Sequence, residues 1–323
     1  MLDYKRFKKD IFLINQENFE SYCLAVYEYQ YSYNPVYREY SDYLNRTPDS
    51  VNTIHDIPFL PIDLFKKHII QTETWEPQKV FQSSGTTGQV RSKHYVRDEK
   101  FYHQVAKSHF ESLYGSLENL QVLALLPSYQ EQENSSLINM VDSFMGLSLP
   151  GSSYFLNNQE ALMETLVSTE RHKILFGVSF ALLDLAEKTS LDVRNLTIIE
   201  TGGMKGRREE IIREELHQKI KNGLGDYPIH SEYGMTELTS QGYMINEYFT
   251  FPKWAKVLIR DVNDPFTYKN DGNSGGLNII DLANIATCSF IETKDLGKID
   301  SQKGFQVLGR FDNSDIRGCN LLL

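Results

Sequence analysis

Phe81-Gln82-Ser83-Ser84-Gly85-Thr86-Thr87-Gly88-Gln89 is the stretch around which the rest of this chain is interpreted. It places serine and threonine hydroxyls and two glycines between two runs of strand composition, Val80-Phe81 and Lys93-His94-Tyr95-Val96. Because glycine tolerates positive φ and adds no bulk, such a turn can bring backbone N–H groups and hydroxyls close to a phosphate. A Walker A loop is excluded, since that pattern needs a lysine directly after its last glycine, and Gln89 follows Gly88. The loop alone leaves phosphate binding and an ordinary Ser/Thr/Gly-rich surface turn open.

The bulk composition is that of a globular protein. At 323 residues, with 41% hydrophobic and 24% charged residues, the chain is long enough for one large domain or two. A net charge of −10 argues against nonspecific nucleic-acid binding but is compatible with a locally basic cleft for ATP. Cys23, Cys288 and Cys319 form no metal-binding or disulfide pattern. No signal peptide opens the chain, and the apolar run 174–185 is short and carries Asp184, so we expect a cytoplasmic protein without membrane insertion.

The first of four expected regions, residues 1–55, is helical. A helix is predicted over Asn18–Tyr31, and Asn34-Pro35 is expected to end it. The many tyrosines of this region are expected to pack between helices with their hydroxyls at the surface. The following stretch, Ile57–Ile62, contains two prolines and is expected to be an extended connector.

Residues 56–240 alternate between strand and helix periodicity. This alternation predicts an α/β core with helices packed over largely parallel strands, and the resemblance described below implies that this core binds the nucleotide. The expected strands are 79–82, 93–97, 121–126, 173–176, 196–200 and 228–232. The expected helices are 98–114, 135–144, 159–168, 179–188 and 206–222. In the last of these helices, Ile212, Leu216 and Ile220 are expected to share one face.

After about residue 240 the helical period disappears. Residues 241–308 are expected to form a smaller, barrel-like β subdomain, because short β-type runs alternate there with Asp/Asn/Gly turns. These runs are 256–260, 276–280, 287–292 and 305–308. Residues 309–323 are expected to be a charged terminus, which the resemblance described below implies to be hinge-like.

A second segment with chemical potential, Ser231-Glu232-Tyr233-Gly234-Met235-Thr236-Glu237, follows the probable strand 228–232. It offers a ring to stack on a base, a glycine that lets backbone approach, a hydroxyl for a phosphate and a carboxylate for Mg²⁺. Further along, Asp295 is suited to accept both hydroxyls of a ribose, and Arg310 lies in a stretch dense in charge. Taken singly, Asp295 and Arg310 are better explained as parts of solvated turns.

Together and in this order, these stretches resemble the acyl- and aryl-adenylate-forming (ANL) superfamily. The resemblance implies that the first loop cradles the ATP phosphates and that the Tyr-Gly-x-Thr-Glu segment holds adenine, the α-phosphate and Mg²⁺. It also implies that Asp295 binds the ribose and that Arg310 marks a hinge. A closer resemblance, to the LuxE-type acyl-protein synthetases, covers nearly the whole chain. It depends on 57–65 (IPFLPIDLF), Ser92-Lys93-His94, 125–129 (LLPSY), 135–137 (SSL), 200–207 (ETGGMKGR), 231–237 (SEYGMTE) and 312–320 (DNSDIRGCN).

What this resemblance implies is an enzyme that uses ATP and Mg²⁺ to activate a carboxylic, typically fatty, acid to acyl-AMP. The acyl group then passes to a thiol, with an acyl-CoA-reductase-like protein or an acyl carrier as partner. The implied fold is a large adenylate-forming domain with helices over mixed sheets plus a small β subdomain. The implied nucleotide-binding residues are Ser83, Ser84, Gly85, Thr86, Thr87, Gly88, Gly202, Gly203, Met204, Glu232, Tyr233, Gly234, Asp295 and Arg310. The implied catalytic residues are Lys93, Lys205, His230, Thr236 and Glu237, with Glu237 also the metal ligand.

Several of these roles have structural alternatives. Residues 202–204 either line the adenine and acyl pockets or form a plain strand-to-helix turn. His230 either lies near the acyl carboxylate or is a hydrogen-bonded structural histidine, and the role of His94 is equally open. Ser135 and Ser136 are expected to cap a helix rather than act as nucleophiles, because no Gly-x-Ser-x-Gly elbow surrounds them.

The chain also departs from its relatives. It ends at Leu323, so the small C-terminal lid domain with its catalytic lysine, and the acceptor-cysteine tail of the luminescence synthetases, are expected to be absent. The acyl acceptor is then Cys319, a cysteine of a partner reductase, a carrier-protein thiol or CoA. Two other functions stay open: an aryl- or acyl-CoA ligase that needs no partner protein, and a non-catalytic nucleotide-binding relic.

Overall fold

The computed structural model describes residues 2–84, 90–128, 130–168, 170–202 and 211–311. Asn34 separates the two longest helices of the N-terminal region: its side chain accepts a hydrogen bond from the backbone N–H of Tyr37, and Pro35 fills the first turn. The predicted helix over Asn18–Tyr31 and its end at Asn34 are confirmed. The helical segments of this region are α1 (Tyr4–Asp10), η1 (Ile11–Leu13), α2 (Phe19–Tyr33) and α3 (Pro35–Tyr43).

Not all tyrosine hydroxyls of this region lie at the surface, as the sequence led us to expect. Tyr27 and Tyr37 are buried, and their hydroxyls donate to the backbone carbonyls of Arg46 and Pro58, each at 2.7 Å. The prediction was wrong for these two tyrosines because the connector after α3 packs on the helices, where its carbonyl groups need donors. The buried tyrosines therefore fasten the connector that leads to the first strand.

The strands and helices of the rest of the chain follow the predicted alternation. The strands are β1 (Leu60–Pro61), β2 (Lys79–Gln82), β3 (Lys93–Val96), β4 (Leu120–Leu125), β5 (Ser153–Tyr154), β6 (His172–Val178), β7 (Leu196–Thr201), β8 (Ile229–Tyr233), β9 (Gly242–Met244), β10 (Phe249–Thr250), β11 (Ala255–Arg260), β12 (Ser274–Asp281), β13 (Phe290–Asp300) and β14 (Gly304–Arg310). The helices are α4 (Leu64–Lys67), α5 (Glu99–Tyr114), η2 (Leu117–Asn119), α6 (Ser136–Leu147), α7 (Gln159–Val167), α8 (Ser179–Ala186), α9 (Arg213–Leu224) and η3 (Leu282–Ala286). Ser135 caps α6, as predicted, whereas Ile212 precedes α9 and is exposed.

One large mixed sheet organises the chain, in the order β11-β12-β13-β14-β10-β9-β8-β7-β6-β4-β5, with β1 beside β13. Its β5-β4-β6-β7-β8 half is parallel, and β9 to β14 pair with one another antiparallel, while β1 runs parallel to β13. The expected barrel-like closure is not found among the described strands. Instead, Phe305 of β14 pairs with Phe249 of β10, so the β-rich region extends the main sheet across the predicted boundary at residue 240. The division into four regions stays a prediction.

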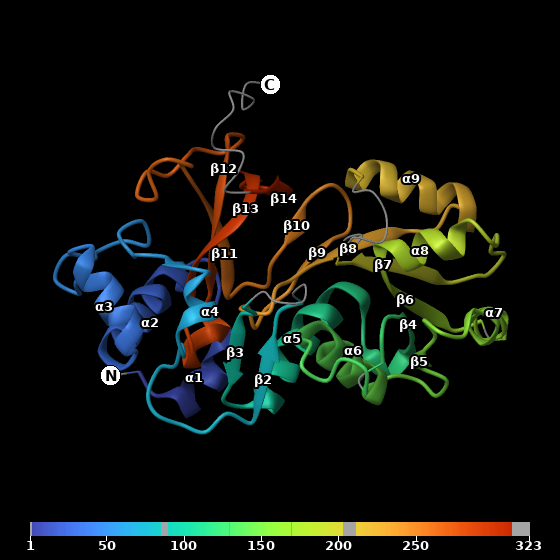
Figure 1. Ribbon diagram of the computed structural model, residues 1–323, viewed down its shortest axis with the longest axis horizontal. Coiled ribbons are helices and arrows are strands. Elements are labelled where there is room, and N and C mark those ends of the chain that lie inside the picture. Colours follow the sequence, from blue (N-terminus) through green and yellow to red (C-terminus); the bar gives the residue numbers. More distant parts are fainter. Residues whose placement is uncertain (1, 85–89, 129, 169, 203–210, 312–323) are drawn as a thin grey trace.

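Helices cover both faces of the parallel half of the sheet. In Figure 1, α8 and α9 lie above these strands, and α5 and α6 lie below them. Buried residues form two clusters: one fills the parallel half, and the other joins the N-terminal helices to the antiparallel half. Within the described ranges, no helix has the length and apolar character needed to cross a membrane.

Candidate active site

Neighbouring parallel strands end together at one edge of the sheet. β6, β7 and β8 end at Val178, Thr201 and Tyr233, and a crevice outside the carboxyl ends of such strands is where open α/β sheets bind ligands. Gly202, directly after β7, has φ of 75°, which favours glycine. After β8, a Cβ on Gly234 would lie 2.5 Å from a carboxylate oxygen of the nearby glutamate, so a larger residue here would displace that side chain. Two of the predicted segments thus begin side by side.

The segment after β8 is held by a buried aspartate at the end of β12. Asp281 accepts hydrogen bonds from the backbone N–H groups of Thr239 and Ser240 at 3.0 and 2.7 Å, and from the Ser240 hydroxyl at 2.7 Å. Next to it, the Asn284 side chain donates to the Glu237 carbonyl at 2.7 Å. The sequence analysis missed Asp281 and Asn284, because their partners are backbone groups more than forty positions away, and no local motif marks them.

His94 connects the strand that follows the Ser/Thr/Gly loop to this same segment. Its Nδ1 lies 2.8 Å from the carbonyl oxygen of Thr236, and its Nε2 lies 3.2 Å from the hydroxyl of Thr287. Burial lowers the pKa of His94 to about 4, although the hydrogen bond to Thr236 opposes that change. The neutral ring therefore donates from Nδ1 to Thr236. This geometry makes His94 a fixed connection between β3 and the segment.

Three predicted site residues from separate parts of the sequence, Tyr233, Asp295 and Arg310, are joined by hydrogen bonds at the end of β8. The Tyr233 hydroxyl donates to Oδ2 of Asp295 at 2.7 Å, and Arg310 Nε donates to Oδ1 at 3.1 Å. The expected turn around Asp295 was wrong: Asp295 lies within β13 and pairs with Arg310 of β14. A register shift at Leu296/Gly297 interrupts the regular pairing next to it. Asp295 is only 7% exposed, so its carboxylate is oriented by these two partners.

Glu237 places a buried carboxylate beside these groups. Burial raises its pKa, while a hydrogen bond from the Ser92 hydroxyl and the positive charges of Arg310 and Lys66 oppose the rise. No group of three or more His, Cys, Asp or Glu side chains suited to a metal occurs in the described part of the chain. Mg²⁺ usually takes one or two carboxylates and completes its shell with phosphate oxygens and water, so the donor set around Glu237 fits that ion together with a nucleotide.

Glu232 turns away from this cluster, toward the end of β7. The Thr201 hydroxyl donates to its Oε2 at 2.5 Å. Burial raises the pKa of Glu232 to about 7; the hydrogen bond from Thr201 opposes the rise, and the negative charge of Glu200 adds to it. The carboxyl group therefore links the ends of two neighbouring strands at the same edge.

The remaining predicted residues are less tightly gathered. His230 lies against α5, with Nδ1 3.1 Å from the Tyr114 hydroxyl, and burial lowers its pKa to about 4. Lys93 is exposed on β3. The Ser83 hydroxyl accepts from the Ser92 backbone N–H at 3.0 Å, which holds the base of the loop. Ser84 is exposed beside it, whereas the predicted residues Gly85, Thr86, Thr87, Gly88, Gly203, Met204 and Lys205 lie outside the described residues.

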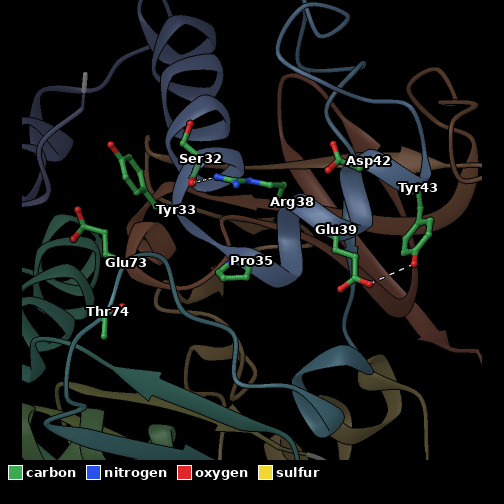
Figure 2. Close-up of a pocket in the computed structure, with 9 residues that line it drawn as sticks. All are labelled: Ser32, Tyr33, Pro35, Arg38, Glu39, Asp42, Tyr43, Glu73 and Thr74. Atoms are coloured by element: carbon green, nitrogen blue, oxygen red, sulfur yellow. Dashed lines mark hydrogen bonds between the residues drawn. The ribbon is translucent and has the colours of Figure 1, made fainter.

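A hollow of about 890 Å³ lies elsewhere, on the N-terminal helices (Figure 2). Some of its side chains already bond one another or the backbone: Arg38 donates to the carbonyl of Ser32, and Tyr43 donates to Glu39 at 3.4 Å. It shares no residue with the groups at the sheet edge. Its lining consists of Ser32, Tyr33, Pro35, Arg38, Glu39, Asp42, Tyr43, Glu73 and Thr74. The candidate active site is therefore assigned from the convergence of side chains at the strand ends.

The two cysteines within the described ranges are both buried and free. Burial raises the pKa of the Cys288 thiol to about 12 and raises that of Cys23 further. A thiol must ionise to act as a nucleophile, so neither cysteine has the environment of a reactive thiolate. Cys319 lies outside the described residues.

Comparison with known proteins gives one family and several structures. The family model for acyl-protein synthetase, LuxE, matches residues 13–323. No curated protein matches the chain. ATP-bound MatB from Rhodopseudomonas palustris is similar at 17% identity and a TM-score of 0.54, over 74% of this chain and 49% of MatB.

Two further structures are similar in the same way. O-succinylbenzoate coenzyme A synthetase (MenE) from Bacillus subtilis, in complex with ATP and magnesium, has 16% identity and a TM-score of 0.51 over 75% of this chain and 52% of its own. 2-Hydroxyisobutyryl-CoA ligase in complex with 2-HIB-AMP has 12% identity and a TM-score of 0.67 over 93% and 70%. At these identities the likeness shows the fold alone, and this chain spans about half the length of MatB and MenE.

Proposed function

Because the chain belongs to the LuxE family of acyl-protein synthetases, we propose that it activates a carboxylic acid with ATP at the carboxyl edge of its parallel strands. The observation that carries this proposal is the meeting of Tyr233, Asp295, Arg310 and Glu237, which come from three separate strands and the segment after β8. The ATP and acyl-adenylate complexes of MatB, MenE and 2-hydroxyisobutyryl-CoA ligase, which share the fold, support it.

The proposed reaction makes a poor electrophile reactive. A carboxylate oxygen attacks the α-phosphorus of ATP, a new O–P bond forms, and the bond to the bridging oxygen breaks so that pyrophosphate leaves with its electron pair. The barrier falls when the two reactants are held in line and when cations and N–H groups neutralise the charge that develops on the phosphate oxygens.

Each residue of the cluster has a part that follows from its contacts. Asp295 would accept the ribose hydroxyls, and Tyr233, held beside it, would lie against the base. Glu237 would hold Mg²⁺, which neutralises phosphate charge when bound, and metal binding would keep this buried carboxylate ionised despite its raised pKa. Arg310, whose side chain is 70% exposed, is free to turn toward a phosphate. The backbone of the Thr236–Glu237 segment is already fixed by His94 and Asn284.

For the second half-reaction, we propose transfer of the acyl group to a thiol outside the described residues. Cys23 and Cys288 are buried with raised pKa values, so they do not suit an acceptor role. We propose a fatty acid as the substrate and a cysteine of an acyl-CoA-reductase-like protein, or the thiol of an acyl carrier, as the acceptor. A CoA ligase is the second candidate, favoured by the CoA and 2-HIB-AMP complex of a structural neighbour that covers 93% of this chain.

Pyrophosphate exchange tests the first step. Labelled pyrophosphate should enter ATP only when the correct acid is present, and hydroxylamine should trap the activated acid as a hydroxamate. A panel of fatty acids of graded length beside aromatic acids identifies the class of substrate. If none of the acids on the panel supports pyrophosphate exchange, the nucleotide-binding relic is favoured. AMP release that depends on CoA without any partner protein would favour the CoA ligase.

A further inference from the structure

The short helix α4 is fixed beside the nucleotide-binding strand β13. β1, just before α4, pairs in parallel with β13, with Pro61 opposite Glu292, and the backbone N–H of Ile62 donates to the Glu292 carbonyl at 3.0 Å. Asp295 lies three residues further along β13. The position of α4 relative to the proposed ribose-binding carboxylate is therefore set by backbone hydrogen bonds.

A second contact joins α4 to the segment after β8. Phe65 of α4 is buried, and its ring packs edge-on against His94, with ring centroids 6.3 Å apart. The same histidine bonds the Thr236 carbonyl, next to Glu237. Figure 1 shows α4 beside β3, the strand that carries His94. The block 57–65, which the proposed reaction leaves without a role, thus builds one wall of the site.

The charged side chains of Asp63, Lys66 and Lys294 carry a net positive charge. The Asp63 carboxylate accepts from Lys66 Nζ at 2.8 Å on one oxygen and from Lys294 Nζ at 2.5 Å on the other. Burial alone would raise the pKa of Asp63, but the hydrogen bonds from Lys294 and Lys66 outweigh it and lower the pKa. One carboxylate between two ammonium groups leaves one positive charge in surplus. In a chain with a net charge of −10, this surplus lies beside the proposed triphosphate site.

The helix that carries Lys66 contacts the site through its neighbour in sequence. Lys66 directly follows Phe65, whose ring packs on His94, and His94 Nδ1 lies 2.8 Å from the carbonyl oxygen of Thr236, the residue before Glu237. The Lys66 side chain is 40% exposed, so the ammonium can leave Asp63 without unburying any core group. A solvent-exposed ion pair of this kind contributes little to stability, which makes the bond to Asp63 easy to exchange.

We propose that Lys66 binds the β- or γ-phosphate of ATP, exchanging its hydrogen bond to Asp63 for one to a phosphate oxygen. Lys294 stays with Asp63 and keeps that carboxylate paired. This inference rests on the proposed function, which it deepens by naming a further cation for the triphosphate. Lysine suits the task because its ammonium is a flexible point charge that can follow the phosphate through the reaction. A cation there also stabilises pyrophosphate as it leaves.

The test compares ATP with AMP, since AMP lacks both outer phosphates. In titrations by calorimetry, Lys66→Met should weaken ATP binding about ten- to hundredfold, the worth of one charge-assisted hydrogen bond, and change AMP binding less than about twofold. Lys67→Met is the matched control, because it removes the same charge from the neighbouring exposed position of α4 and should leave both affinities unchanged. Lys66→Arg should retain most of the ATP affinity.

Each other outcome overturns the inference. Equal losses for ATP and AMP in Lys66→Met, with an unchanged melting temperature, would mean that the lysine acts through the fold of the site. If Lys66→Met binds ATP as tightly as the wild type, or if Lys67→Met loses the same ATP affinity, then Lys66 does not bind the triphosphate. A wild-type chain that binds no ATP would also contradict the inference. A wild-type chain that binds ATP, shows the Lys66 effect, and yet gives no pyrophosphate exchange with any acid would overturn the proposed function alone.

Discussion

Asp281 and Asp295 are both buried aspartates on the antiparallel half of the sheet, yet their surroundings differ in kind. Asp281 is fully buried and accepts from three backbone N–H groups and one hydroxyl, all within the protein core. Asp295 is bonded by two side chains, Tyr233 and Arg310, and the Arg310 side chain is 70% exposed. Backbone partners cannot leave without unfolding the loop, whereas side-chain partners can turn away when a ligand arrives.

We therefore distinguish two parts of the candidate site. The anchor consists of Asp281, Asn284 and His94, and the exchangeable part consists of Asp295 and Glu237 with their side-chain partners. Asp281, Asn284 and His94 fix the backbone of the segment after β8 and have no group to offer a substrate. Asp295 and Glu237 are held by side chains, and under the proposed function a nucleotide and a metal ion replace those partners. A preorganised backbone below exchangeable side chains is what charge stabilisation in a transition state requires.

The largest effect is expected from removing the anchor. Asp281→Ala leaves the N–H groups of Thr239 and Ser240 without acceptors in the core, and we expect it to lower the free energy of unfolding by about 3–5 kcal/mol. Urea denaturation followed by circular dichroism measures this. Asp295→Ala is the matched control: it should cost about 1–2 kcal/mol, because it leaves one buried donor, the Tyr233 hydroxyl, without an acceptor, whereas its other partner, Arg310, is largely solvated. If the two variants lose the same free energy of unfolding, the distinction between anchor and exchangeable contacts is wrong.

The next effect is on catalysis rather than on stability. Glu237→Gln should lower pyrophosphate exchange by about a hundredfold or more, since the amide cannot hold Mg²⁺ or neutralise phosphate charge through it. The melting temperature should stay within a few degrees of the wild-type value. Glu73→Gln serves as the control, because Glu73 pairs with Arg97 outside the cluster. Unchanged exchange in Glu237→Gln would move the metal site elsewhere.

A third effect depends on pH and comes from His94. Its folded pKa of about 4 lies below the ordinary 6.5, so the unfolded chain binds more protons between these values, and stability is lost as pH falls through that window. His94→Gln removes this dependence. The stability difference between wild type and variant should therefore shrink by about 2 kcal/mol from pH 6.5 to pH 5. Urea unfolding at both pH values measures it, and a constant difference would show that His94 does not titrate as a buried neutral ring.

The sequence predicted the exchangeable part of the site better than the anchor. Tyr233, Glu237, Asp295 and Arg310 were selected because their segments resemble, in the same order, the nucleotide-binding segments of a known superfamily. The alternation of strands and helices predicted a sheet only for the segment that contains Tyr233; Asp295 was expected in a separate β subdomain and Arg310 in the terminus, and the structure places β8, β13 and β14 in one sheet. The β11–β14 strands were expected to form a barrel because short runs with Asn/Gly turns do not show which edge they join; the Phe249–Phe305 pairing, 56 positions apart, decides that.

The anchor residues could not be predicted from the sequence for a related reason. Asp281 and Asn284 act on backbone atoms of a segment distant in sequence, and backbone atoms have no identity that a pattern can display. His94 was noticed as part of a block, but its role stayed open because an imidazole that fixes a loop and one that transfers a proton look alike in sequence. Only the two distances from its ring nitrogens, to Thr236 and Thr287, assign it to the anchor.

The smallest effect tests whether the partners of Asp295 truly exchange. If a ribose hydroxyl takes the place on Oδ2 that the Tyr233 hydroxyl now occupies, Tyr233 gives up its 2.7 Å bond when ATP binds. Tyr233→Phe then removes a competitor and keeps the ring beside Phe249 and Phe305. We expect the free energy of unfolding to fall by about 1 kcal/mol and ATP to bind as tightly as before or up to about threefold more tightly. Calorimetric titration of the variant decides, since tenfold weaker binding would mean that the hydroxyl itself contacts the nucleotide and belongs with the anchor.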